Sequence, residues 1–195
     1  MNKIIFNDSI ELVRQINKEQ IVDPFFVASE LGIDVVSNRA IEKDGYLICT
    51  NGIKLILISS RVTNTHRKKF ILSHELGHFL LHNDQMYGCD NISAASNFKI
   101  NTPRQEEEAN LFASELLLPK DKLKQELPTK TLSFDDIINV ADRYDVSVTL
   151  SAIQCIKLSQ TEEELLLCYE DQRLKWFSTS DKRIRYNDIP KVCPV

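Results

Sequence analysis

The chain has 195 residues, 43% of them hydrophobic and 27% charged, which is ordinary globular composition with room for a sizeable core. Its formal net charge of −4 argues against a broad nucleic-acid-binding surface. The first residues lack the apolar stretch of a secretory signal, and no segment approaches the roughly 18 apolar residues that span a bilayer. We therefore expect a soluble cytoplasmic protein.

The cysteines are few and scattered. Their number is odd, and none forms a Cys-x-x-Cys pair, so they predict neither a disulfide framework nor a thiolate metal site. A nucleophilic cysteine beside a histidine is conceivable, but no local signal supports it. We interpret the cysteines as small buried residues or reduced surface thiols; they are Cys49, Cys89, Cys155, Cys168 and Cys193.

Two helices are predicted at the start of the chain. Apolar residues at helical spacing indicate an amphipathic helix over residues 8–18. Asp23 and Pro24 suit the start of a second, short helix, and Gly32 suits its end.

A small sheet is predicted next. Residues 33–37, 45–50 and 53–60 are rich in residues that favour strands. Asn51-Gly52 between the last two segments is a strong signal for a tight hairpin turn.

Residues 65–83 predict a long helix with the motif His-Glu-Leu-Gly-His at positions 74–78. His74 and His78 lie four residues apart on one helix face, so both rings can reach one metal ion, with Glu75 beside the open coordination position. This pattern is typical of zinc hydrolases, in which the ion acidifies a water and the glutamate takes its proton. The alternative is an amphipathic helix whose histidines only make hydrogen bonds.

Three other features belong to this region. Gly77 allows a neighbouring backbone to approach the helix closely. His82 lies about 12 Å further along the helix than His74, so we interpret it as a non-ligand. Residues 83–101 predict a long polar loop, either a wall of the cleft or a mobile insertion.

The next helix has clear end signals. Thr102, Pro103 and Gln105 form a predicted capping box with proline in the first turn, and Pro119 marks the end of the helix. Ala109, Phe112, Ala113, Leu116 and Leu117 form its predicted buried face.

Three consecutive glutamates occupy the first turns of this helix. Glu106 fits the buried face best, whereas Glu107 and Glu108 are expected to turn progressively towards solvent. A carboxylate that points into a protein needs a partner, and a zinc ion held by His74 and His78 would complete a His₂Glu site. The alternative is that all three glutamates are solvated and only complement the helix dipole.

The segment from Phe70 to His78 and the segment from Glu106 to Pro119 together resemble the ImmA/IrrE family of metallo-endopeptidases. The resemblance extends over about residues 22–158; Ser73 and Leu118 replace the usual Ala and Met without touching the chemistry.

The resemblance implies that His74, His78 and Glu106 are zinc ligands, that Glu75 is the general base and that Asn110 orients a ligand histidine. It also implies a regulatory protease of bacterial or phage origin. The substrate is typically a helix-turn-helix transcriptional repressor of a mobile element or a stress response.

Residues 133–144 and 147–158 predict a pair of helices. Such a pair can read DNA, but the second helix offers only Lys157 as a basic residue, so we interpret the pair as packing elements.

The last 35 residues predict a β-hairpin and a polar tail. We expect a metallopeptidase domain over residues 1–160 and a possible partner-binding appendage over residues 161–195. A modest basic patch at Lys182, Arg183 and Arg185 is interpreted as solvated tail, with a partner site as the alternative.

Together these features predict an α+β fold, with a small sheet packed on helices and the zinc site between the two motif helices. The predicted function is zinc-dependent endoproteolysis. Two alternatives stay open, a regulatory protein that binds its partner without cleaving it and a DNA-binding module. Tyr87, His82 and Tyr144 are unranked candidates for stabilising the oxyanion.

Overall fold

The computed structural model describes Glu11 and residues 22–39, 41–50, 52–82, 102–161 and 163–193. The chain divides into two compact units, Met1–Leu117 and Leu118–Val195. The predicted helix over residues 8–18 and the predicted loop over residues 83–101 lie outside the described residues, apart from Glu11.

The first described element is the short helix α2, Pro24–Glu30. The Asp23 side chain accepts a hydrogen bond from the Phe25 backbone N–H, and Pro24 occupies the first turn, as predicted. Gly32 follows the helix with a φ of +65°, a conformation that glycine adopts without strain.

A three-stranded mixed sheet follows, made of β1 (Asp34–Asn38), β2 (Gly45–Thr50) and β3 (Ile53–Ser59). The strand order is β1-β3-β2, with β1 parallel and β2 antiparallel to β3. Strands β2 and β3 form the predicted hairpin, and Gly52 in its turn has a φ of +80°. Strand β2 is therefore an edge of this sheet.

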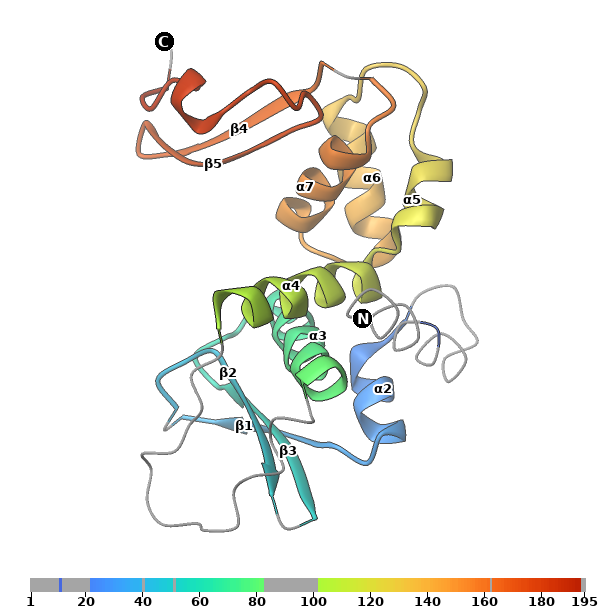
Figure 1. Cartoon of the computed structure of the whole chain (residues 1–195), viewed down its shortest axis with the longest axis vertical. Helices are drawn as coiled ribbons and strands as arrows, with labels where there is room; N and C mark the ends of the chain where they lie inside the picture. The colour runs from blue at the N-terminus through green and yellow to red at the C-terminus, as the bar shows by residue number, and fades with distance from the viewer. Residues whose placement is uncertain are drawn as a thin grey trace. The chain divides into compact units, whose positions relative to one another are not determined.

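Two long helices complete the first unit: α3, Thr65–His82, and α4, Pro103–Leu117. Helix α3 lies between the sheet and α4, and α2 packs beside it (Figure 1). The capping box of α4 is formed as predicted: Gln105 N–H donates to Thr102 Oγ1, and Thr102 N–H donates to Gln105 Oε1.

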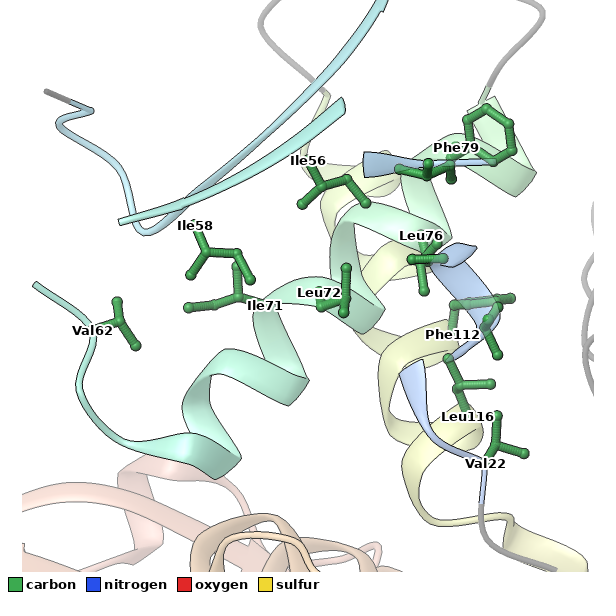
Figure 2. Close-up of a cluster of buried hydrophobic side chains, with 13 residues drawn as sticks. Val22, Ile56, Ile58, Val62, Ile71, Leu72, Leu76, Phe79, Phe112 and Leu116 are labelled. Atoms are coloured by element: carbon green, nitrogen blue, oxygen red, sulfur yellow. The ribbon is translucent and has the colours of Figure 1, made fainter. Parts of the chain in front are cut away.

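The core of the first unit is shared by the sheet and both long helices. Figure 2 shows Leu72 and Leu76 of α3 between Ile58 of β3 and Phe112 of α4. Leu72, Leu76 and Phe112 are completely buried. This packing fixes the face that α3 presents to α4, and so fixes the position of the histidines on that face.

The second unit contains three helices, α5 (Lys120–Glu126), α6 (Phe134–Tyr144) and α7 (Val148–Leu158). Helix α6 begins with the predicted capping box of Ser133 and Asp136. Helices α6 and α7 are joined by the Ser151 hydroxyl, which is buried and donates to the Ile137 carbonyl. The pair therefore packs as core elements, as predicted; α5 was not predicted.

The predicted hairpin is formed by β4, Leu165–Glu170, and β5, Arg173–Thr179. It is tied to the helices of its unit, because Ser178 Oγ donates to the carbonyl of Ile153 in α7. The segment after it folds back on the hairpin: Leu174 N–H donates to the Lys191 carbonyl. The segment is therefore attached to the hairpin, and Lys182, Arg183 and Arg185 on it are exposed, as expected for a solvated patch.

The predicted domain boundary at residues 160 and 161 falls inside the second compact unit. The role of residues 161–195 in binding a partner stays a prediction. No helix in the described ranges combines the length and hydropathy needed to cross a membrane. The cysteines in the described part of the chain are free thiols, as expected: Cys49, Cys155, Cys168 and Cys193.

Candidate metal centre

Helices α3 and α4 bring three of the predicted site residues together. Their ligand atoms, one each from His74, His78 and Glu106, all lie within 4.8 Å of one another. His74 and His78 are one turn apart on α3, and Glu106 comes from the first turns of α4. The prediction that Glu106 faces the histidines while Glu107 is exposed agrees with this arrangement.

The distances within this group suit a tetrahedral cation. His74 Nε2 lies 3.0 Å from His78 Nε2 and 3.2 Å from Glu106 Oε2, and His78 Nε2 lies 3.4 Å from Glu106 Oε1. Zinc bonds of about 2.0–2.1 Å in tetrahedral geometry separate neighbouring ligand atoms by about 3.3 Å. Two imidazoles and one carboxylate are also a donor set typical of catalytic zinc, so the residues fit the ion.

The rings are turned so that Nε2 points into the group. His74 Nδ1 lies 2.9 Å from Asn110 Oδ1, which agrees with the expected orienting role of Asn110. His78 Nδ1 lies 3.0 Å from His82 Nδ1. Both histidines thus have a hydrogen-bond partner behind the ring, as ligand histidines usually do.

The electrostatic environment favours neutral imidazoles. Burial, followed by the neighbouring His74, lowers the pKa of His78 to about 4. Burial also lowers the pKa of His74, although the charge of Glu106 opposes this shift. Neutral imidazole is the form that binds a metal ion.

Glu75 is held between α3 and the edge strand β2. The side chain is buried, and the Leu47 backbone N–H of β2 donates to the carboxylate. Burial, followed by the charge of Glu106, raises the pKa of Glu75 to about 7, with Lys43 acting in the opposite direction. A carboxylate with this pKa can take up and release a proton near neutral pH.

Two glycines allow the close approaches that build this site. A Cβ atom on Gly45 would lie 2.5 Å from Ile71 Cγ2 and 2.9 Å from Glu75 Oε1. A Cβ atom on Gly77 would lie 3.1 Å from Ala109 Cα, so α3 and α4 meet almost backbone to backbone. The prediction for Gly77 is therefore confirmed.

The prediction that Glu108 turns to solvent is wrong. Glu108 Oε2 lies 3.1 Å from His82 Nε2, and Glu108 Oε1 accepts a hydrogen bond from Arg104 Nε. Glu106 and Glu108 are about 160° apart around the helix, measured through Ala109, so they lie on opposite edges of a buried face that includes Ala109. Both edges reach α3.

Two of the three candidates for an oxyanion donor already make hydrogen bonds to other residues. His82 is engaged on both ring nitrogens, by His78 and Glu108. The Tyr144 hydroxyl belongs to the second unit and donates to Glu126 Oε1 at 3.0 Å. Tyr87 lies outside the described residues.

Comparisons with known proteins agree with this geometry. Residues 28–154 match the family model of Peptidase_M78, described as the IrrE N-terminal-like domain. The chain is also 33% identical over 125 residues to the uncharacterized immunity region protein 2 of Bacillus phage phi105. This match covers 64% of this chain and 75% of the phage protein.

The fold also resembles a solved structure of a Mycobacterium tuberculosis transcriptional regulator, with a TM-score of 0.56 and 13% sequence identity. That match covers 91% of this chain, which spans only 55% of the regulator. At this identity the likeness concerns the fold alone. The family match covers well over half of the chain and includes both motif helices, so this protein belongs to the IrrE N-terminal-like (Peptidase_M78) family of zinc metallopeptidases.

Proposed function

We propose that this protein is a zinc-dependent endopeptidase that cleaves an internal peptide bond of a protein substrate. One observation carries the proposal: His74 Nε2, His78 Nε2 and the Glu106 carboxylate converge at distances that suit a tetrahedral cation. The buried carboxylate of Glu75 follows His74 directly on the same helix. This is the set of groups that metal-assisted peptide hydrolysis needs.

In this proposal, His74, His78 and Glu106 hold the ion. When bound, zinc supplies Lewis-acid chemistry, which makes water a better nucleophile and polarises the substrate carbonyl. Glu75 accepts a proton from the attacking water on a carboxylate oxygen and delivers it to the leaving amine nitrogen as the C–N bond breaks. The Leu47 N–H holds the Glu75 carboxylate in place during these transfers.

The proposed substrate is a helix-turn-helix transcriptional repressor of a mobile element or stress response, cleaved in the cytoplasm where such repressors act. Two findings support this choice: the resemblance of the two motif segments to the ImmA/IrrE family, and the similarity to a protein of a phage immunity region. The same site is also compatible with a regulatory protein that binds its partner without cleaving it. The test must therefore detect cleavage itself.

The test is incubation of the purified protein with the repressor encoded nearest to its gene. Fragments are identified by mass spectrometry in the presence of zinc, after removal of metal with a chelator, and after zinc is restored. We expect cleavage at one internal position, loss of cleavage on chelation and its return with zinc. An intact repressor that forms a stable complex with the zinc-loaded protein would support the binding protein instead.

A further inference from the structure

His82 forms a hydrogen-bonded chain between a proposed ligand and a second glutamate. The His78 ring contacts the ligand group through Nε2, while its Nδ1 lies 3.0 Å from His82 Nδ1. On the other side of the His82 ring, Nε2 lies 3.1 Å from Glu108 Oε2. His82 is only 8% exposed, and its contact with His78 is buried.

The Glu108 carboxylate fixes the direction of its hydrogen bond with His82, and with a neutral His82 ring it fixes the direction of the whole chain. An ionised carboxylate only accepts hydrogen bonds. His82 Nε2 therefore carries a proton and donates a hydrogen bond to Glu108. A neutral His82 then has its lone pair on Nδ1, where it accepts from His78 Nδ1–H. With its proton on Nδ1, His78 has its lone pair on Nε2, the atom that faces His74 and Glu106.

We propose that His82, held by Glu108, is a positioning residue for His78, fixing the ring orientation and tautomer that present Nε2 to the metal ion. This inference rests on the proposed function, because it assumes that His78 is a ligand. Supporting partners of ligand histidines usually contribute about 10- to 100-fold to metal affinity or activity. Here the support is a second histidine whose own tautomer is set by a carboxylate.

The two proposed ligand histidines are supported differently. His74 Nδ1 contacts Asn110 directly, whereas His78 Nδ1 contacts His82, which in turn contacts the Glu108 carboxylate. Arg104 contacts Glu108 Oε1, but its side chain is 72% exposed, and exposed ion pairs contribute little. The positioning role is therefore assigned to His82 and Glu108. A purely structural role, in which His82 only packs the end of α3 against α4, is the alternative.

Three variants of the full-length protein separate these roles. His82→Leu replaces the ring with an apolar side chain of similar bulk and removes the hydrogen bonds to His78 and Glu108. His82→Asn restores an acceptor oxygen near the position of Nδ1 and loses the contact with Glu108. Glu107→Gln is the matched control, because Glu107 is the exposed neighbour of Glu108 on the same helix.

Zinc affinity is measured by competition with a chelating dye, and the visible spectrum of the cobalt-substituted protein reports ligand geometry. We expect His82→Leu to weaken zinc binding about 10- to 100-fold and to change the cobalt spectrum. His82→Asn should recover most of the affinity, and Glu107→Gln should match the wild type. Thermal unfolding of the metal-free proteins shows that the variants are folded.

The outcomes that overturn the inference are specific. Zinc binding by His82→Leu within about threefold of the wild type, with an unchanged cobalt spectrum, would remove the positioning role. If His82→Leu does not fold, His82→Asn decides: a folded His82→Asn protein that has lost zinc affinity as completely as His74→Ala would show that an acceptor beside His78 Nδ1 does not preserve the site, and the positioning role would be abandoned. Failure of the proposed function looks different, because the wild type would then bind no zinc, or His74→Ala would bind it normally.

Discussion

Substitution of Gly77 by alanine tests the close approach of α3 and α4 on which the site depends. The added Cβ would lie 3.1 Å from Ala109 Cα, 3.2 Å from the Ala109 carbonyl oxygen and 3.2 Å from Phe112 Cβ. Two of these three atoms are backbone atoms, so a rotation of one side chain cannot relieve the contact. Helix α4 would have to move away from α3 by a few tenths of an ångström.

Two opposing terms set the effect on stability. Alanine is favoured over glycine inside a helix by about 1 kcal/mol, whereas an overpacked core costs about 1–3 kcal/mol. We expect a net loss of about 0–2 kcal/mol. The effect on metal binding should be clearer, because metal sites tolerate only about 0.2 Å of displacement and Glu106 moves with α4. We expect zinc affinity to fall at least about tenfold.

The assays are urea denaturation of the metal-free protein and zinc competition titration, with Glu107→Gln as a control for a substitution that leaves this contact intact. A Gly77→Ala protein that is more stable by about 1 kcal/mol and binds zinc like the wild type would refute the reasoning. That result would mean that helix propensity alone acts at this position, and that α3 and α4 are not in tight contact.

Further predictions concern each of the two units. Glu106→Ala should abolish stoichiometric zinc binding and Glu107→Ala should not, as measured by metal analysis after dialysis; the opposite result would show that the wrong glutamate is assigned. In the second unit, Glu164 is buried, and its Oε1 accepts hydrogen bonds from the Leu132 N–H and the Thr161 hydroxyl, both at 2.8 Å. Glu164→Ala removes the acceptor of the Leu132 N–H and should lower the free energy of unfolding by about 1–3 kcal/mol in urea denaturation. An unchanged unfolding midpoint would show that water replaces the carboxylate.

Much of the fold was predictable, because short-range signals determine the ends of its elements. Asn51-Gly52 predicted the β2–β3 hairpin, and Thr102 with Gln105 predicted the start of α4. These signals act within a few residues, so they need no knowledge of the tertiary structure. Helix α5 has no such signal: its N-cap, Pro119, makes no side-chain capping bond.

The chain of contacts behind His78 was not predictable to the same degree. The spacing of His82, four residues after His78, did place both histidines on one face of α3. The sequence did not show where Glu108 lies. Only the packing of α4 on α3 shows that both edges of the buried α4 face, with Glu106 on one and Glu108 on the other, contact α3. For a similar reason, the sequence did not predict that the segment after the hairpin folds back on it, since the bond from the Leu174 N–H to the Lys191 carbonyl links residues 17 positions apart.

The central claim is that this site hydrolyses peptide bonds, and Glu75→Gln tests it most directly. Glutamine preserves the size of the side chain but cannot accept the proton. We predict that zinc content, fold and partner binding survive in this variant. Cleavage of the cognate repressor should fall by about 10²- to 10⁴-fold, the contribution of a general base. Cleavage by zinc-loaded Glu75→Gln at the wild-type rate would contradict the account.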